Sequence, residues 1–472
     1  MNRKRCLLLI LLVSVGVAAA CGGGSSPAPP PVGGNPPPAT AAPVSVAITD
    51  APPAGVSVLS LEVLVTSAVL QPGNVQLVTT PVQLEVKRLE VEAAFLSTIN
   101  VPAGTYTSVA LTFSNPELTI RNDSNAAIGA VCAVGAICEF KPTVTGTFTF
   151  SGSPFPITVT ANTPAGLLVD VNLNSIITGA NTLDFTAAGA LVVTQLNAAQ
   201  GTGQLEELED IKGRISAVRA ASNEFDLQLS NSRTLTIRTD AATQFEDFND
   251  PTGINCAANN FSCLAVGQVV EVKLRLIAGG ALLARKIEAE DNDNEEELEG
   301  IVVDVANLPA SFDMVLTDEA VNAAGVEVGQ RVRVNLIGTP RFRIDSDGLT
   351  VVQTDFDAAS DLRIGQVVEV ERRSNPVGTP PAFDTDRVVL KDTRLTGRVQ
   401  SITTATNTIV LDNLPSFFGV TTLEVRITPG QTEFKNTTGL AALAAGDTVS
   451  VRGLLFKGST APFIAAKKIR KR

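Results

Sequence analysis

The sequence predicts an all-β chain in which an N-terminal β-sandwich precedes three small β-barrels. The first observation is a strand that occurs three times, as Val-Gly-Gln-Val-Val-Glu-Val at 266–272, as Ile-Gly-Gln-Val-Val-Glu-Val at 364–370, and in a diverged form at 445–451. In each copy a glycine precedes alternating apolar and polar residues, which is typical of a strand with one buried face. The second observation is that similar alternation, interrupted by turns rich in Pro and Gly, runs through the chain from residue 43.

The N-terminal segment predicts export and lipid attachment. Basic residues at 3–5 precede a short apolar run, so residues 1–20 have the pattern of a signal peptide. The sequence Ala-Ala-Ala-Cys at 18–21 resembles the lipobox of bacterial lipoproteins, which implies that Cys21 is acylated, for example with palmitate, and becomes the new N-terminus. The alternative is ordinary leader-peptidase cleavage after residue 20, with an incidental cysteine.

The segment that follows is expected to be a tether. Residues 21–43 are rich in Gly, Ser and Pro, a composition that cannot bury a core and favours an extended spacer. Gly22 stands where the retention signal of Gram-negative lipoproteins has Asp, so the resemblance implies an outer-membrane anchor. The protein would then face the periplasm or the cell surface.

Residues 44–198 predict a β-sandwich of the immunoglobulin or transthyretin type. Val44, Val46 and Ile48 alternate with polar or small residues, and later runs repeat this rhythm between turns. Only residues 86–97 favour a helix or a helical turn.

Three motifs in this region resemble a bacterial lipoprotein family, domain of unknown function 4382. They are Val-Ala-Ile-Thr-Asp-Ala-Pro at 46–52, Val-Pro-Ala-Gly-Thr-Tyr-Thr at 101–107 and Leu-Val-Asp-Val-Asn-Leu at 168–173. The resemblance implies an exported sandwich-like module with no established activity, so it supplies no catalytic residue. We interpret the motifs as turn and strand-entry sequences, with ligand contacts as the alternative.

The remainder predicts three barrel repeats, at 205–291, 295–392 and 393–472, with a period of roughly 80 to 100 residues. Each repeat has a strand led by glycine, a strand that ends on phenylalanine, the Gly-Gln-Val-Val-Glu-Val strand and a final strand, all in the same order. About five short strands with glycine at their entries favour a small OB-like barrel.

These landmarks resemble a second bacterial family, domain of unknown function 5666, whose units occur in tandem in exported proteins. The resemblance spans nearly all of residues 205–472. Its likeness to OB-type barrels does not define a function. Binding of nucleic acid by an OB barrel uses aromatic side chains in a basic groove, whereas this region has no Trp or Tyr and the whole chain carries a formal charge of −12. We therefore expect no nucleic-acid partner.

Four cysteines follow Cys21, in two closely spaced pairs. An exported protein meets an oxidising compartment, so we predict disulfides Cys132–Cys138 and Cys256–Cys263. Other pairings of four cysteines remain formally open. A zinc site is disfavoured because neither pair has a nearby histidine or third ligand.

Two charged segments are also candidates for function. Asp291, Asp293 and Glu295 alternate as calcium ligands do, but the loop lacks the glycine and the terminal glutamate of an EF-hand, so a solvated linker is the main interpretation and weak calcium binding the alternative. The C-terminus, Lys-Lys-Ile-Arg-Lys-Arg at 467–472, is interpreted as a charged strand end, with contact to anionic envelope polymers as the alternative.

The composition argues against catalysis. The chain contains no histidine, which excludes Ser-His-Asp and Cys-His machinery and histidine-rich metal sites. We expect no enzyme activity and no cofactor. The sequence thus predicts a lipid-anchored envelope protein that binds or scaffolds, with envelope polysaccharide or protein as its partner. A carbohydrate-binding or carbohydrate-processing protein is the alternative.

Overall fold

The computed structural model describes residues 41–51, 57–90, 94–128, 132–144, 147–163, 165–179, 182–197, 208–229, 233–248, 256–277, 281–289, 296–319, 325–346 and 348–472. The predicted all-β class is confirmed, because the α-helix found in these segments is the single turn α1 (Leu173–Ile176). Residues 40–472 form one unit by their internal contacts. The predicted signal peptide, Cys21 and nearly all of the tether lie outside the described residues.

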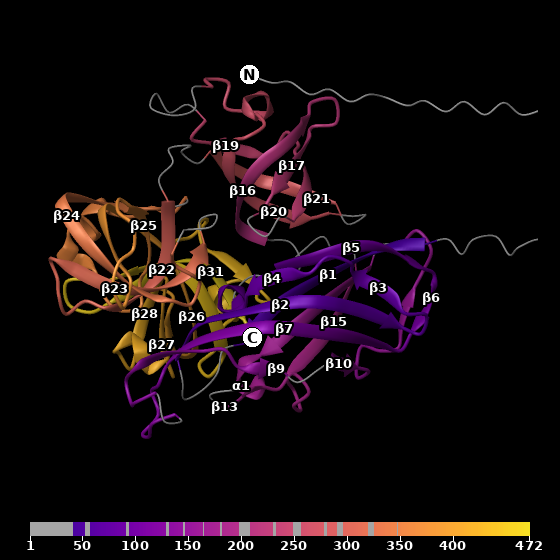
Figure 1. Ribbon diagram of the computed structural model, residues 1–472, viewed down its shortest axis with the longest axis horizontal. Helices are drawn as coiled ribbons and strands as arrows, with labels where there is room; N and C mark the ends of the chain where they lie inside the picture. Colours follow the sequence, from indigo (N-terminus) through magenta and orange to yellow (C-terminus); the bar gives the residue numbers. More distant parts are fainter. Residues whose placement is uncertain are drawn as a thin grey trace, which may run out of the picture. The chain divides into compact units, whose positions relative to one another are not determined.

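Two β-sheets form the N-terminal sandwich (Figure 1). The first has the strand order β15 (Leu191–Asn197), β12 (Ala165–Asn172), β1 (Ala41–Ala51) and β5 (Ala94–Pro102). The second has the order β10 (Thr147–Phe150), β7 (Ser108–Arg121), β2 (Ser57–Gln71) and β3 (Val75–Val78), with β4 (Val82–Glu85) on β2 and β8 (Ile137–Phe140) on β7. Five short strands complete the domain, namely β6 (Gly104–Tyr106), β9 (Thr143–Val144), β11 (Ile157–Val159), β13 (Ile177–Gly179) and β14 (Thr182–Leu183).

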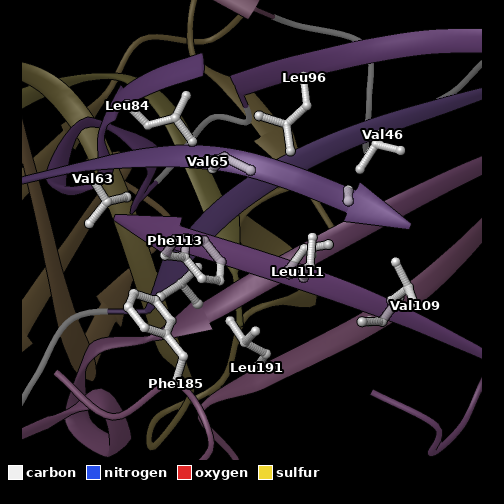
Figure 2. Close-up of a cluster of buried hydrophobic side chains, with 14 of the residues drawn as sticks. Val46, Val63, Val65, Leu84, Leu96, Val109, Leu111, Phe113, Phe185 and Leu191 are labelled. Atoms are coloured by element: carbon white, nitrogen blue, oxygen red, sulfur yellow. The ribbon is translucent and has the colours of Figure 1, made fainter. Parts of the chain in front are cut away.

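The sandwich core comes from the alternation that the sequence shows. In β7 the side chains of Val109, Leu111 and Phe113 are all buried on one face (Figure 2). Phe113 stacks on Phe185, with ring centroids 4.0 Å apart and planes 9° from parallel. Burial of such large apolar side chains contributes most of the favourable free energy of folding in a core of this kind.

The helix favoured over residues 86–97 is only partly present. A 3-10 helix, η1, covers Val86–Glu90, and strand β5 begins at Ala94. The prediction is wrong from Ala94 to Ser97, because this segment pairs with β1. The hydrogen bonds between the two strands outweigh a weak local preference for helix.

The Pro-Ala-Gly-Thr-Tyr motif has a structural role. The Tyr106 ring is buried, and its hydroxyl donates a hydrogen bond of 2.8 Å to the carbonyl oxygen of Pro102. Burial raises the pKa of the phenol. This contact within the motif agrees with its interpretation as a turn and strand entry.

Three closed barrels follow the sandwich, which we name barrel 1, barrel 2 and barrel 3 in chain order (Figure 1). In barrel 1 the antiparallel neighbours run β18–β17–β16–β20–β21, and β18 closes the ring by pairing parallel to β21. Its strands are β16 (Leu208–Arg219), β17 (Glu224–Gln228), β18 (Thr234–Arg238), β19 (Gln244–Glu246), β20 (Val269–Leu276) and β21 (Leu282–Ala289).

Barrels 2 and 3 repeat this connectivity and share one long strand. Barrel 2 contains β22 (Glu296–Asp304), β23 (Ser311–Glu319), β24 (Arg331–Ile344), β25 (Val367–Arg372) and β26 (Ala382–Thr403). Barrel 3 uses the second half of β26 with β27 (Thr408–Asp412), β28 (Leu423–Ile427), β29 (Glu433–Lys435), β30 (Thr448–Phe456) and β31 (Phe463–Lys471). Single 3-10 turns occur at Phe261–Cys263, Gln353–Asp355, Ala359–Asp361, Ser416–Phe418 and Leu440–Ala442.

The glycine of the repeated motif is required by the turn that it forms. Gly267, Gly365 and Gly446 each have a φ of 94°, a region that side chains with a Cβ rarely adopt. The next residue caps the same turn through its side chain. The Oε1 of Gln366 accepts a hydrogen bond of 2.8 Å from the amide of Arg363, and Asp447 accepts one in the same way. The Gly-Gln pair is therefore turn chemistry.

Replacement of this glycine tests how tightly the barrels pack. We expect Gly446→Ala to lower the free energy of unfolding by about 1–3 kcal/mol, the usual cost of a strained backbone conformation. Gly365→Ala is expected to cost more, because an added Cβ would lie 2.5 Å from the Phe418 ring, whereas the space around Gly446 is open. Urea unfolding of the two variants measures the difference. Equal losses would mean that Phe418 does not restrict this position.

Candidate functional site

The outward faces of the repeated strands meet other barrels. In barrel 1, Val270 and Val272 of β20 are buried and Glu271 and Lys273 are half-buried, as expected for a strand with one buried face. The expectation is wrong for β30, in which all residues from Val449 to Phe456 are buried, and for most of β25. The reason is that outward residues of these strands pack against a neighbouring barrel. Leu454 and Phe456 of β30 join the apolar core of barrel 2, and Val367 of β25 joins that of barrel 3.

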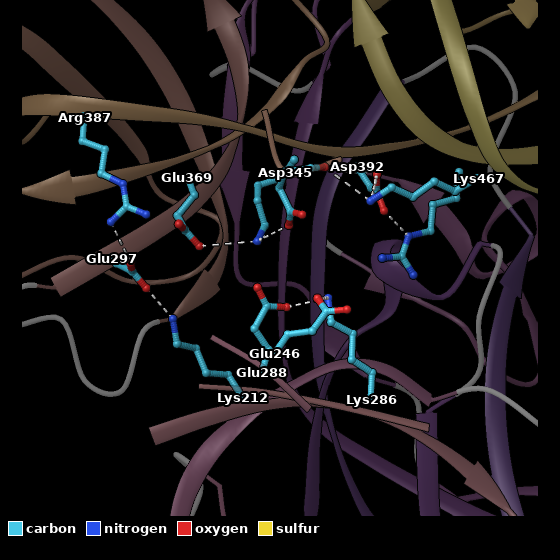
Figure 3. Close-up of polar contacts among 12 residues, drawn as sticks. Lys212, Glu246, Lys286, Glu288, Glu297, Asp345, Glu369, Arg387, Asp392 and Lys467 are labelled. Atoms are coloured by element: carbon cyan, nitrogen blue, oxygen red, sulfur yellow. Dashed lines mark hydrogen bonds and ion pairs between the residues drawn. The ribbon is translucent and has the colours of Figure 1, made fainter. Parts of the chain in front are cut away.

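A network of charged side chains fills the space between the barrels, and we call it the junction (Figure 3). It encloses a void of only about 10 Å³. Its carboxylates are those of Glu271, Glu288, Glu299, Asp345 and Asp392. Its cations are Lys273, Lys391, Arg394, Arg452 and Lys467. The junction is therefore balanced in formal charge, as the burial of charged groups requires.

Lys391 on β26 lies among four carboxylates, three of the junction and that of Glu369 beside it. Its Nζ is 2.8 Å from Asp345 Oδ2 and 3.8 Å from Glu369 Oε2. Burial by itself lowers the pKa of the ammonium group, but the carboxylates outweigh burial and the pKa stands well above its ordinary value. These carboxylates belong to Glu369, Glu271, Asp345 and Glu299.

Further ion pairs connect the repeats at the same place. Arg452 Nε is 2.7 Å and Lys467 Nζ 3.0 Å from the two oxygens of Asp392. Lys212 of barrel 1 pairs with Glu297 of barrel 2 (Figure 3). Burial raises the pKa of Glu288, although Lys286, at 2.8 Å, acts in the opposite direction.

A cleft of about 390 Å³ lies between barrel 1 and barrel 3, next to the junction. This volume is within the range of about 300–1,000 Å³ that is usual for small-molecule sites. The cations of the cleft are Lys273, Arg275, Arg285 and Lys286 from barrel 1, and Arg452, Lys467 and Lys468 from barrel 3. Its carboxylates are those of Asp240 and Glu433. Seven cations against two carboxylates make the lining basic in a chain whose formal charge is −12.

The C-terminal basic run therefore has two roles in the structure. Residues 467–471 belong to strand β31, as the strand-end interpretation expects, and Lys467 and Lys468 also line the cleft. Burial, aided by the positive charge of Arg472, lowers the pKa of Arg470 to about 10. The sequence marked the run as basic, but no local pattern placed it opposite the cations of barrel 1.

The structure forms both predicted disulfides. Cys132 and Cys138 are bonded with an S–S distance of 2.07 Å, and Cys256 and Cys263 with one of 2.03 Å. None of these four cysteines is among the described residues that line the cleft.

The described segments provide no support for the calcium site or for any other metal site. Asp291, Asp293 and Glu295 lie outside the described residues. Among the residues that are described, no group of three or more Asp, Glu or Cys side chains is arranged to hold a metal ion. In the same segments, no helix has the length and apolar character needed to cross a bilayer.

Comparison with known families supports the resemblance for two of the three barrels. Two of the barrels match one family. The sequence model of the family described as "Domain of unknown function (DUF5666)" matches residues 212–288, in barrel 1, and residues 396–460, in barrel 3. No curated protein matches the chain. The two matched barrels are the two that form the cleft.

The charge of Lys391 is expected to stabilise the folded chain over a wide pH range. Because its pKa is higher in the folded than in the unfolded chain, its contribution is complete below about pH 10.4 and is lost only as the pH rises through the raised value. We expect Lys391→Met to lower the free energy of unfolding at about pH 7 by about 3–5 kcal/mol, since the carboxylates lose their shared counter-ion.

This loss is expected to shrink toward about pH 5. Without Lys391, mutual repulsion raises the pKa of the folded carboxylates, so the folded variant takes up protons before the unfolded chain does and regains stability as the pH falls. Urea unfolding at several pH values measures this. Lys141→Met is the control, because Lys141 pairs with Glu117 at 2.8 Å but is 62% exposed, and its loss is expected to cost less than about 1 kcal/mol. Equal losses for the two variants would contradict a stabilising role for the junction.

Proposed function

We propose that this protein is exported, lipid-anchored at Cys21 and held in the outer membrane of a Gram-negative envelope, where it acts by binding or scaffolding and not by catalysis. The sandwich resembles domain of unknown function 4382, and the barrels resemble domain of unknown function 5666, which matches two of them. Both resemblances are to modules of exported proteins. The two disulfides support an oxidising compartment outside the cytoplasm.

The observation that carries the binding role is the cleft shared by barrels 1 and 3. It is built from side chains of two repeats, and its polar lining consists of Lys, Arg, Gln, Asp and Glu. Such a lining holds ligands by charge and hydrogen bonds. The tether predicted at residues 21–43 would keep this surface at a distance from the bilayer.

The alternative is a carbohydrate-binding or carbohydrate-processing protein. The same cleft supports its carbohydrate-binding version. Neutral sugars are commonly held against aromatic rings, and the described residues of the cleft lining include none. Its cations would instead select a saccharide that carries negative charge.

Acylation is tested by expressing the full chain in a Gram-negative host beside Cys21→Ala. We expect the intact mass of the membrane-extracted wild type to correspond to cleavage before Cys21 with added acyl chains. The variant should lose the acyl mass and leave the membrane fraction, because an acylated N-terminus is the proposed anchor. Cys256→Ser, which alters a cysteine far from the leader, is the control and should remain acylated. An unacylated, soluble wild type would refute the anchor.

A further inference from the structure

We propose that the cleft between barrel 1 and barrel 3 is a binding site for an anionic saccharide, one that carries carboxylate or phosphate groups on its sugar rings. The inference deepens the proposed function and rests on it, because it names the ligand of an envelope binding protein. It depends on the geometry of the cleft and not on the lipid anchor. An experiment can therefore refute the saccharide site without refuting the anchor, and the reverse.

The first argument is the placement of charge. The chain as a whole has 48 acidic and 36 basic residues, yet the cleft has seven basic and two acidic ones. Lys273, Arg452 and Lys467 also border the junction, where carboxylates such as Asp392 neutralise them. Lys286 is likewise neutralised, because its Nζ lies 2.6 Å from Glu246 and 2.8 Å from Glu288. When these four are set aside, the described lining has three cations, Arg275, Arg285 and Lys468, against the two carboxylates. A cleft lined by charges of one sign raises the local concentration of ligands of the opposite charge.

The second argument is that the cations are held in place. Arg452 and Lys468 have only 3% and 4% of their side chains exposed. Arg452 is fixed by an ion pair of 2.7 Å with Asp392, whereas Lys468 is held by burial and lies 3.7 Å from Glu433. Arg275 is 44% exposed, and its closest described carboxylate partner is Asp240 at 3.9 Å, a loose pair. The cleft thus joins buried basic side chains to an exposed one, Arg275, which can reorient toward a ligand. Pre-organised charges of this kind bind at low entropic cost.

The third argument concerns the class of anion. Single-stranded nucleic acid is held by aromatic stacking as well as by charge, and none of the described residues that line the cleft is aromatic. A volume of about 390 Å³ accommodates a ligand of about one or two sugar rings. Gln244 and Gln431 add amide groups that can donate to and accept from sugar hydroxyls. Charge with hydroxyl recognition favours an acidic saccharide.

The binding test uses the full chain purified in detergent and titrated calorimetrically with a hexuronate oligosaccharide, a sugar phosphate, inorganic phosphate, a neutral oligosaccharide and a thymidine oligonucleotide. We expect binding of the hexuronate or of the sugar phosphate, weakened by added salt. Binding of the hexuronate would identify carboxylate as the group recognised, and binding of the sugar phosphate would identify phosphate. Binding of inorganic phosphate alone, equal binding of the oligonucleotide, or no binding at all would overturn the proposal.

Matched variants place the site. Arg275→Gln with Arg285→Gln alters the wall of barrel 1, and Lys467→Gln alters that of barrel 3. We expect each to weaken binding about tenfold or more, as for loss of a charge-assisted hydrogen bond. The controls are Arg238→Gln and Arg398→Gln, exposed cations of the same barrels that pair with Glu224 and Asp412 outside the cleft. Loss in the controls, or dependence on one wall only, would overturn a shared cleft.

A gain of affinity separates binding from damage to the fold. Asp240 is 45% exposed, and its Oδ1 accepts a hydrogen bond of 2.9 Å from the amide of Ala242, which an asparagine oxygen can replace. Asp240→Asn removes a repelling charge from the cleft, so we expect it to tighten binding several-fold, with the gain lost at high salt. Unchanged or weaker binding by a folded Asp240→Asn would contradict the proposal. If Cys21→Ala shows no anchor while the cleft binds, only the proposed location fails.

Discussion

The architecture of residues 208–472 depends on strands that use both of their faces. One face of each repeated strand is apolar and closes its own barrel, as Val270 and Val272 do in barrel 1. The other face meets the neighbouring barrels, through charged side chains such as Glu271 of β20 and through apolar ones such as Val367 of β25. Burial of charge is tolerated only where opposite charges satisfy one another, so the equal numbers of cations and carboxylates at the junction restrict how the barrels assemble.

The barrels are attached to their neighbours in two physically different ways. Barrels 2 and 3 share strand β26 and an apolar cluster in which Val315 and Val367 of barrel 2 pack with Leu395 and Ile409 of barrel 3. Leu59 of the sandwich joins that cluster, and the Thr119 hydroxyl donates to the Gly329 carbonyl of barrel 2 at 2.6 Å. Barrel 1 has an apolar core of its own, and its described links to the other domains are polar, such as Lys212 with Glu297.

This difference links the junction to the cleft. Lys273, Arg452 and Lys467 belong to both, so the charges that hold the barrels together also form part of the cleft lining. A contact made mainly of ion pairs is more sensitive to salt than an apolar one. An anion in the cleft would add attraction between barrel 1 and barrel 3, where cations face each other across the opening.

The sequence by itself determined the fold class, the repeat and the local chemistry. Alternation with period two identified the strands, and the Gly-Gln signature identified a turn that needs a positive φ at Gly267, Gly365 and Gly446. The disulfide pairs were predictable because the cysteines of each pair are only six or seven residues apart, which leaves few geometric options. All these features depend on residues close to one another in the chain. The helix expected at 86–97 failed at Ser97, where pairing with a distant strand decided the conformation.

Only the tertiary structure decided what the polar faces do. The sequence placed Glu271 and Lys273 on an outward face, which is usually solvated, and nothing local distinguishes a face in water from one against another barrel. The same holds for Arg452, which is almost fully buried, and for Lys467, which lies opposite cations from a repeat nearly two hundred residues earlier. Electrostatic interaction depends on distance in space, and the closure and packing of the barrels set those distances.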